Sequence, residues 1–223
     1  MRAAIVIPAL NEEATVARVV AAVAPFGSAV VVDDGSIDAT GERAEAAGAV
    51  VVRHERNGGY DAALASGFQW ASEHDYDAVV SIDADGQHDP TLLGRVLDPL
   101  AAAEVDMVLG IRAAPARVSE RLFGMYTARR FGVPDVLCGV KAFRVATYRQ
   151  HRAAMASSSI GTGLALACLR AGVRFGLVPV PIAPRADAPR VGSTLRANLL
   201  IGRALGRALV ADGSHAANRA FRH

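Results

Sequence analysis

Cysteine, lysine, aromatic residues and long apolar runs are all scarce in this 223-residue chain. Its two cysteines, Cys138 and Cys168, cannot form a disulfide framework or a four-cysteine zinc site, so we expect a reducing compartment. No stretch reaches about 18 apolar residues, so we expect no membrane-spanning helix. Polar residues follow Ala3–Ala9 too soon for the apolar core of a signal peptide, and these absences together favour a cytoplasmic location.

Motifs of several enzyme and binding classes are also missing. No glycine pattern matches a Walker loop or the G-x-G-x-x-G fingerprint, which disfavours kinases, nucleoside triphosphatases and dinucleotide oxidoreductases. The six histidines have no H-x-x-x-H or H-E-x-x-H spacing, so a zinc site is not expected. Aromatic residues make up 5% of the chain and no nucleic-acid recognition motif occurs, so nucleic acid is not an expected partner.

The chain does contain a sharp division of charge. Residues 1–111 hold 6 Arg and 18 Asp or Glu, a net charge of −12. Residues 112–223 hold 17 Arg, one Lys and 4 Asp or Glu, a net charge of +14. This division predicts cation binding in the first half and anion binding in the second. The alternative is a dipolar surface without a function.

Short apolar runs alternate with helical patterns along the first half. The expected strands are Ala3–Pro8, Ala29–Asp33, Ala49–Arg53, Ala78–Ile82 and Met107–Gly110. The expected helices are Glu12–Val23 with Asn11 as its N-cap, Asp38–Ala47, Tyr60–Ser72 and Pro90–Ala103. Strands separated by single helices predict right-handed βαβ units and a parallel sheet.

The second half is less regular. The expected helices are Arg117–Phe131, Gly163–Ala171 and Ser193–Val210, the expected strands are Gly139–Arg144 and Arg174–Pro179, and Ala183–Gly192 is expected to be a loop. No segment has the composition of a linker between domains. We therefore expect one domain over residues 1–210, with halves 1–111 and 112–210, followed by a flexible tail at 211–223.

Polar and acidic residues follow three of the expected strands. They are Asn11 and Glu12 after the first strand, Asp33 and Asp34 after the second, and Asp83 and Asp85 after the fourth. Ligands of open α/β sheets bind beyond the carboxyl ends of the strands, so these side chains are candidates for one site. Crowded carboxylates raise each other's pKa values, which a divalent cation or ligand hydroxyls would relieve. Helix capping is the alternative, and we expect only capping from Asp38 and Asp89.

The sharpest candidate is the pair Asp83 and Asp85, one residue apart between an apolar strand and the helix that Pro90 is expected to open. Two such carboxylates can face one hard cation. Mg²⁺ or Mn²⁺ takes few protein oxygens and completes its coordination with diphosphate and water. The amide oxygen of Gln87 is a candidate third ligand.

Four segments carry the most specific pattern in the chain. They are V-I-P-A-L-N-E-E at 6–13, V-V-D-D-G-S-I-D-A-T at 31–40, R-N-G-G at 56–59 followed by A-A-L and Gly67, and D-A-D-G-Q-H-D-P at 83–90. In this order they resemble family 2 glycosyltransferases of the GT-A fold, and the last segment is most similar to dolichyl- and polyprenyl-phosphate sugar transferases. The resemblance covers about residues 3–145. It implies an α/β protein with a mostly parallel central sheet and helices on both faces.

The resemblance also implies a nucleoside diphosphate sugar, carrying GDP or UDP, as the donor. The residues implied to bind it are Pro8, Leu10, Glu12, Val32, Asp34, Asp83, Ala84 and Arg112. Leu10 stands where the family usually has Tyr, so a stacking contact is expected to be weaker. The implied ligands of Mg²⁺ or Mn²⁺ are Asp83, Asp85 and Gln87, and the implied catalytic residues are Asp85, Arg112 and Arg190.

One departure from the family concerns the acceptor. Members that glycosylate hydroxyls usually carry an acidic residue on the helix that corresponds to Gly163–Ala171, but no Asp or Glu occurs between Asp135 and Asp187. A base accelerates reaction of a hydroxyl by about 10²–10⁴-fold, whereas a phosphate monoester is already ionised at pH 7. We therefore expect a phosphate acceptor, held by Arg190 or, if the register of the segment differs, by Arg185. If a base is needed, Asp135 and Asp187 are the first candidates.

The sequence thus predicts an inverting glycosyltransferase that moves a sugar to a phosphate-bearing acceptor, with polyprenyl phosphate foremost. A soluble acceptor, such as a phosphorylated metabolite or a natural product, and a non-catalytic nucleotide-sugar-binding protein are the alternatives. The helix expected at 193–210 has Arg196, Arg203 and Arg207 on one stripe. It can lie on the inner face of the membrane or pack on the sheet with these arginines outward, and both options stay open.

Overall fold

The computed structural model describes residues 1–84, 91–113, 117–153, 161–181, 198–199 and 201–210. The strands are β1 (Ala3–Ala9), β2 (Ser28–Asp33), β3 (Val50–Arg53), β4 (Ala78–Ser81), β5 (Met107–Arg112), β6 (Lys141–Arg144) and β7 (Phe175–Val180). The helices are α1 (Val16–Val23), α2 (Thr40–Ala46), α3 (Tyr60–Glu73), α4 (Leu92–Ala101), α5 (Val118–Phe131), α6 (Val145–His151) and α7 (Thr162–Arg170), and residues 201–210 are also helical.

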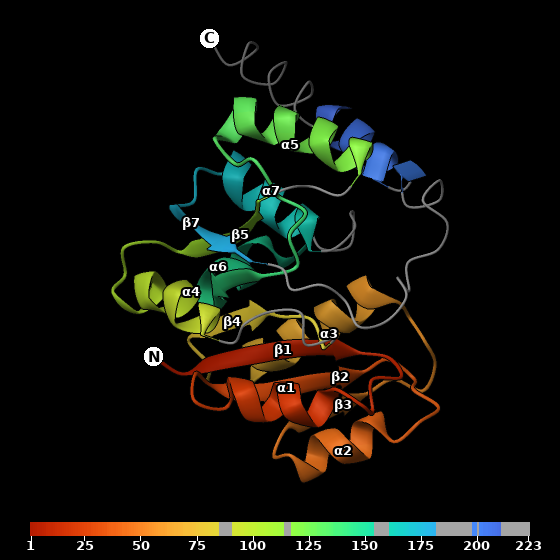
Figure 1. The fold of residues 1–223 in the computed structure, drawn as a ribbon. Helices are drawn as coiled ribbons and strands as arrows, with labels where there is room; N and C mark the ends of the chain where they lie inside the picture. Colours follow the sequence, from red (N-terminus) through yellow and green to blue (C-terminus); the bar gives the residue numbers. More distant parts are fainter. Residues whose placement is uncertain (85–90, 114–116, 154–160, 182–197, 200, 211–223) are drawn as a thin grey trace.

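The strands form one seven-stranded sheet in the order β3-β2-β1-β4-β6-β5-β7 (Figure 1). Neighbouring strands are parallel except at β6, which is antiparallel to both β4 and β5. The predicted α/β fold with a mostly parallel sheet is confirmed. The sequence predicted a strand near β6 but neither its place between β4 and β5 nor its direction.

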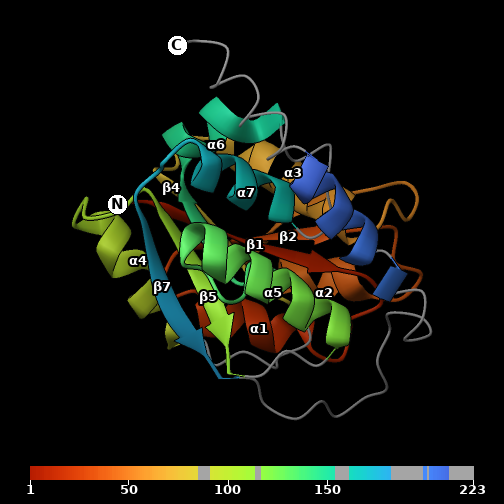
Figure 2. The same cartoon turned by 90° about the horizontal axis from the view of Figure 1, so that it is seen from above.

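Helices cover both faces of the sheet, as predicted (Figures 1 and 2). On one face α1, α2 and α4 pack against the sheet, and on the other face lie α3, α5, α6, α7 and the 201–210 helix. Alternate residues of β1 point to opposite faces, with Ile5 and Ile7 in the first layer and Ala4 and Val6 in the second. Burial on both faces explains why β1 is a continuous apolar run rather than an alternating one.

The first helix begins later than the sequence pattern predicted, and Asn11 is not its N-cap. α1 starts at Val16, and Asn11 has a φ of +53°, in the left-handed region that Asn tolerates. Its side-chain oxygen accepts the backbone N–H of Ile37 at 3.0 Å, and its own N–H donates to the hydroxyl of Ser36 at 3.0 Å. Asn11 therefore ties the loop after β1 to the loop after β2, and this long-range role displaces the local capping role.

The 201–210 helix packs on the α5 and α7 side of the core. Ile201, Ala204 and Ala208 are buried there, while Arg203 and Arg207 are exposed. Arg203 and Arg207 therefore lie on the exposed face of this helix, which is compatible with both options that the sequence left open. The remainder of the predicted 193–210 helix, the predicted loop at 183–192 and the predicted tail at 211–223 lie outside the described residues.

Candidate active site

The carboxyl ends of all the mutually parallel strands lie at one edge of the sheet, and β6 begins at that edge. This edge collects predicted site residues that are far apart along the chain. Leu10 follows β1, Asp34 follows β2, Asp83 follows β4 and Arg112 ends β5. The topology therefore brings the donor-side predictions into one region.

Three residues that were predicted to line the nucleotide site have buried side chains. Pro8 and Val32 are Cα partners in neighbouring strands, and both are buried. Ala84 packs within the core layer that contains α1. Contacts of Val32 and Ala84 with a nucleotide would therefore involve their backbone atoms rather than their side chains.

Asp34 is held by three hydrogen bonds. Its Oδ1 atom accepts the backbone N–H of Gly58 at 2.9 Å, and its Oδ2 atom accepts the N–H of Gly59 at 2.8 Å. The Nδ1 atom of His54 lies 2.6 Å from Oδ1. Asp34 is only 3% exposed, so the protein fixes the position of this carboxylate.

The Gly58–Gly59 turn also leads into α3, whose first residue reaches the end of β4. Gly59 has a φ of +88°, which favours glycine, and the next residue, Tyr60, donates its hydroxyl hydrogen to Oδ1 of Asp83 at 2.9 Å. Burial first, and then the negative charge of Asp83, raise the pKa of Tyr60 well above its usual value. The hydroxyl therefore stays protonated, and one turn joins the carboxylates that follow β2 and β4.

Asp83 also lies against the segment that precedes β6. A Cβ atom on Gly139 would lie 3.0 Å from Oδ2 of Asp83, so glycine leaves room for the carboxylate. The hydroxyl of Ser81 donates to the carbonyl of Gly139 at 2.6 Å. Lys141 is the sole lysine of the chain, is 2% exposed, and donates from Nζ to the carbonyl of Cys138. Burial lowers the pKa of Lys141.

Arg112 is paired with acidic side chains of its own chain. Its Nε and Nη2 atoms donate to the two carboxylate oxygens of Asp135 at 2.7 and 2.9 Å, and Nη2 lies 3.5 Å from Glu120. Burial tends to raise the pKa of Asp135, but the hydrogen bonds and charge of Arg112 hold that pKa below its usual value. Asp135 is thus a poor candidate for the base. Contact between Arg112 and the sugar phosphate stays a prediction.

The acidic residues after β1 and β2 support the neighbouring loops. Glu12 accepts the hydroxyl hydrogen of Thr15 at 2.9 Å, and its backbone N–H donates to the hydroxyl of Thr40 at 2.8 Å. Asp38 accepts the N–H of Thr40, the first residue of α2, at 3.0 Å and that of Glu13 at 3.3 Å. Burial opposes ionisation of Asp38, but a hydrogen bond from the hydroxyl of Thr40, together with these two N–H groups, lowers its pKa. The N-cap position of α2 is Ala39, and Asp38, one residue earlier, supports the start of the helix through Thr40.

Several predicted residues lie outside the described part of the chain: Asp85, Gln87, Asp89, Arg185, Asp187 and Arg190. Among the described residues, no group of three or more His, Cys, Asp or Glu could hold a metal ion. Asp83 is the one predicted ligand that the structure describes. It offers carboxylate oxygen at a strand end, which is the ligand type that Mg²⁺ and Mn²⁺ prefer.

The sequence did not single out His54, Tyr60 or Lys141 as site residues. His54 contacts a carboxylate 20 residues away, and Tyr60 contacts one 23 residues away. A spacing rule along the chain cannot find such pairs. For Lys141 a signal existed, since it is the sole lysine of the chain and lies inside the predicted strand Gly139–Arg144, where a lysine is rarely buried.

Comparison with known proteins identifies the class. Residues 4–160 match the profile described as glycosyl transferase family 2, and the chain belongs to this family. The predicted GT-A fold is supported by solved structures. Glucosyl-3-phosphoglycerate synthase from Mycobacterium tuberculosis, in a complex with Mn²⁺, UDP and glucosyl-3-phosphoglycerate, superimposes with a TM-score of 0.72 at 23% identity, over 94% of this chain and 79% of that chain.

Two named relatives are more similar in sequence. Undecaprenyl-phosphate mannosyltransferase of Micrococcus luteus is 32% identical over 170 residues, which is 67% of this chain and 69% of that protein. Polyprenol monophosphomannose synthase of Mycolicibacterium smegmatis is 31% identical over 164 residues, 64% of this chain and 62% of that protein. An uncharacterized Methanocaldococcus jannaschii protein is 37% identical over 110 residues, which is 45% of its length. The match thus spans between about half and two thirds of these relatives.

Proposed function

We propose that the protein is an inverting glycosyltransferase that moves a sugar from a nucleoside diphosphate sugar to a phosphate-bearing acceptor, most naturally a polyprenyl phosphate. The observation that carries this proposal is the sheet edge, where Asp34 and Asp83 are linked by one turn while Asp135 is engaged by Arg112. Donor-side carboxylates are present. The two described acceptor-half carboxylates near Arg112, Asp135 and Glu120, are both paired with arginine, so neither is free to act as a base. The names of the two bacterial relatives support the same acceptor.

On the donor side, the residues fit a divalent cation. Asp83 would be a ligand of Mg²⁺ or Mn²⁺, together with Asp85 and Gln87, and the cation would supply positive charge that stabilises the departing diphosphate. Tyr60 holds one oxygen of Asp83 and Gly139 leaves room beside the other, so this carboxylate is oriented by the protein. Asp34 would accept a hydrogen bond from the nucleobase.

On the acceptor side, a phosphate oxygen attacks the anomeric carbon from the face opposite the nucleotide. A new carbon–oxygen bond forms, the bond to the diphosphate breaks, and the nucleoside diphosphate leaves with its electron pair. The acceptor oxygen carries no proton at pH 7, so no base is needed. Arginines are suited to holding two anions that otherwise repel each other, and Arg190 or Arg185 would hold the acceptor phosphate.

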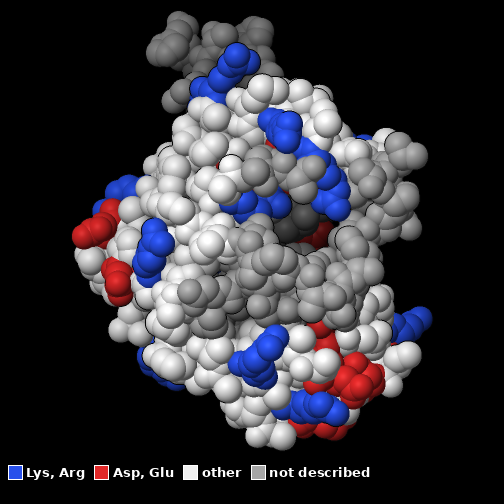
Figure 3. Space-filling model, in the orientation of Figure 1, with Lys and Arg blue, Asp and Glu red and all other residues white. Residues whose placement is uncertain are grey.

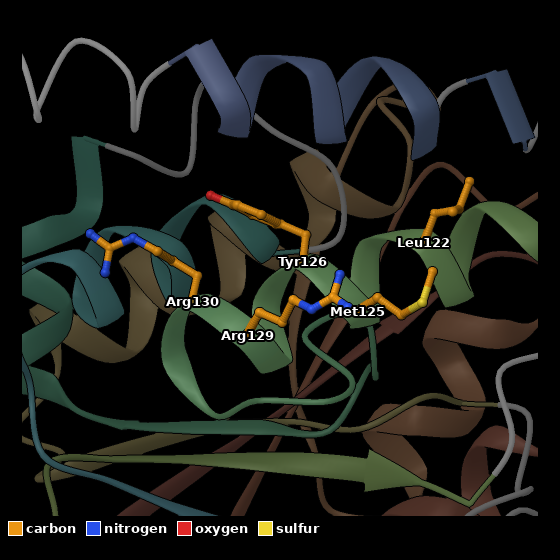
Figure 4. A pocket seen from close by; sticks show the side chains of 5 residues that line it. All are labelled: Leu122, Met125, Tyr126, Arg129 and Arg130. Atoms are coloured by element: carbon orange, nitrogen blue, oxygen red, sulfur yellow. The ribbon is translucent and has the colours of Figure 1, made fainter.

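We also propose contact with an anionic membrane surface. The 201–210 helix exposes Arg203 and Arg207, next to Leu209 and Val210. It lies beside α5 (Figures 1 and 2), whose hollow of about 490 Å³ is lined by Leu122, Met125, Tyr126, Arg129 and Arg130 (Figure 4). Figure 3 shows arginine side chains gathered over this upper part of the molecule. None of the described residues of the structure forms a helix that is long and apolar enough to cross a bilayer.

The membrane proposal is tested by sedimentation with vesicles of phosphatidylcholine, with and without phosphatidylglycerol. Each arginine near an anionic surface contributes about 1 kcal/mol, so replacing Arg203 and Arg207 by Ala should weaken binding to the anionic vesicles more than about tenfold. The matched control replaces Arg43 and Arg53, which pair with glutamates on the acidic half. Equal binding by both double variants would remove this surface from the proposal.

A soluble phosphorylated acceptor is the second candidate, because the structural relative named above is called a glucosyl-3-phosphoglycerate synthase. The deciding experiment incubates the protein with Mn²⁺ and a panel of UDP- and GDP-sugars. Three acceptors are compared: a polyprenyl phosphate, phosphoglyceric acid and a polyprenol without phosphate. Release of nucleoside diphosphate only with a phosphate acceptor supports the proposal. Transfer to the polyprenol would contradict it, and binding without turnover would indicate a binding protein.

A further inference from the structure

His54 lies between two polar side chains from different elements. Its Nδ1 atom is 2.6 Å from Oδ1 of Asp34, and its Nε2 atom is 2.9 Å from the hydroxyl oxygen of Ser66 on α3. The side chain of His54 is 19% exposed and that of Asp34 is 5% exposed, so both hydrogen bonds are largely shielded from water. Hydrogen bonds join the three side chains, and neither His54 nor Ser66 belongs to the four sequence motifs.

The direction of these hydrogen bonds follows from the chemistry of the groups. An ionised carboxylate can only accept, and both oxygens of Asp34 already accept backbone N–H groups, so we assign Nδ1 of His54 as the donor. In the neutral ring Nε2 is then an acceptor, and Ser66 donates to it. Asp34 therefore fixes the tautomer of His54, Ser66 holds the ring at its other nitrogen, and His54 fixes the rotation of the Asp34 carboxylate.

The backbone around His54 is fixed as well. Its N–H donates to the carbonyl of Asp33 at 2.9 Å, which continues the pairing of β2 with β3. A Cβ atom on Gly35 would lie 2.8 Å from the backbone of Arg56 and Asn57, so the segment after His54 packs directly on the chain after β2. His54 is thus fixed by its backbone N–H, which binds Asp33, and by Nε2 of its ring, which binds Ser66.

A carboxylate has about four acceptor positions, and three donors occupy Asp34 in the described structure. Oδ1 carries two of the donors, from Gly58 and His54, whereas Oδ2 carries one, from Gly59. One acceptor position therefore remains, on Oδ2. A nucleobase that places a ring N–H opposite Oδ2 can use it, as uracil and guanine can, whereas the corresponding ring nitrogen of cytosine and adenine is itself an acceptor.

We propose that His54 is a positioning residue that orients Asp34 and thereby sets selection of the nucleobase, with Ser66 holding the ring. The inference rests on the proposed function, since it assigns Asp34 to the nucleobase. Serine hydrolases use the same order of side chains. Here the backbone N–H groups of Gly58 and Gly59 donate to Asp34, so they do not form an oxyanion hole, and the geometry favours positioning.

The test compares three variants by calorimetry, with UDP, GDP and CDP as probes in the presence of Mg²⁺. His54→Ala should weaken binding of the preferred nucleotide, UDP or GDP, by about tenfold and change CDP binding less than about twofold. His54→Asn should retain most of the selectivity, because its amide nitrogen occupies nearly the position of Nδ1. His54→Gln places its amide nitrogen near the position of Nε2 and should not restore selectivity.

Unfolding of a variant would lower its affinity for UDP, GDP and CDP together. The decisive measurement is therefore the ratio of the affinity for UDP or GDP to the affinity for CDP. The matched control is His74→Ala, because His74 is exposed, stacks on Trp70 and ends α3 far from Asp34 in the chain. An unchanged ratio in His54→Ala would overturn the inference, as would equal behaviour of the Asn and Gln variants. If the unmodified protein binds neither UDP nor GDP, the proposed function itself fails.

Discussion

At the scale of single residues, acidic side chains of the first half divide into two kinds that look alike in sequence. Asp34 and Asp38 are four residues apart, yet Asp34 lies at the sheet edge and Asp38 holds the start of α2. Asp34 accepts hydrogen bonds from the backbone N–H groups of Gly58 and Gly59, more than 20 residues away in the chain. Asp38 is bound mainly by its near neighbour Thr40. Position relative to the strand end, rather than charge, distinguishes the carboxylate proposed to contact the nucleobase from the one that supports the start of α2.

This division predicts different outcomes for Asp34→Ala and Asp38→Ala. Loss of a charge-assisted hydrogen bond costs about 1.5–3 kcal/mol, so Asp34→Ala should weaken nucleotide binding by about tenfold or more. Asp38→Ala removes a capping interaction and should lower the free energy of unfolding by about 1 kcal/mol without changing nucleotide affinity. Calorimetry and urea denaturation of both variants check these outcomes. Equal nucleotide affinities would count against Asp34 as a nucleobase contact.

Tyr60 offers a second test at this scale, because Tyr60→Phe deletes one hydroxyl and leaves the ring. Asp83 would lose the donor that lies 2.9 Å away and with it one constraint on its orientation. We expect the concentration of Mn²⁺ needed for half-maximal turnover to rise about tenfold, with little change in unfolding temperature. Tyr76→Phe is the control, since Tyr76 contacts Trp70 and Arg2 instead. A metal dependence that matches the control would show that Tyr60 does not orient a metal ligand.

The strand-end residues could be predicted because of a local rule: parallel strands point their carboxyl ends to one edge. That rule places Asp34 and Asp83 without knowledge of the strand order. His54 and Tyr60 could not be found in this way, because their roles depend on which turn folds onto which strand. The sequence shows a Gly58–Gly59 turn but does not show that its N–H groups reach Asp34.

At the scale of elements, the main difference from the predicted arrangement is β6. β4 and β5 are consecutive strands, and a regular βαβ pattern would make them neighbours, but β6 lies between them and pairs with both. β6 is only four residues long, K-A-F-R, and so short a pattern indicates neither the neighbours of a strand nor its direction. The placement of β6 brings Gly139 and Lys141 next to Asp83 at the candidate site. The predictions from the sequence had assigned neither residue to the site.

The pair of Arg112 and Asp135 links β5 to the loop before β6 and gives a prediction for stability. Because the folded-state pKa of Asp135 is lowered, its contribution is present above the ordinary carboxyl pKa of 3.8 and is lost as the pH falls through the lower folded value. Asp135→Asn should therefore cost about 3 kcal/mol of unfolding free energy at pH 7. The difference from the unmodified protein should shrink below a pH of about 4. Urea denaturation at pH 7, 4 and 3 checks this, and a difference that does not vary with pH would exclude the ion pair as its cause.

At the scale of the whole molecule, the two charge halves meet in one sheet. The acidic half supplies β1 to β4, and the basic half supplies β6 and β7 with the helices around them. Figure 3 shows acidic side chains near the lower part of the visible face, but arginines occur among them. Within the acidic half, Arg43 pairs with Glu13, and Arg53 pairs with Glu42 and Glu45. Both arginines belong to residues 1–111, so their ion pairs offset part of the negative charge within the acidic half itself.

The acceptor prediction belongs to this scale because it depends on a long segment of the second half that lacks carboxylates. From 136 to 186 the chain has no carboxylate, and Asp135 is held ionised by Arg112. A phosphate monoester has a second pKa of about 6 and is mostly dianionic above pH 7. We therefore expect the rate of transfer to polyprenyl phosphate, measured as release of nucleoside diphosphate, to be nearly constant from pH 7 to about 9.

The same argument assigns the arginines a role in binding rather than in proton transfer. Arg190→Ala, or Arg185→Ala if the register differs by one residue, should raise KM for the phosphate acceptor with less change in affinity for the nucleotide sugar. Lys in the same position should restore the acceptor KM only in part, because an ammonium group cannot make the bidentate contact of a guanidinium. A rate that rises with pH through one titrating group, together with transfer to a plain hydroxyl, would mean that a base acts after all. Asp187 would then be the leading candidate, because Asp135 is already committed to Arg112.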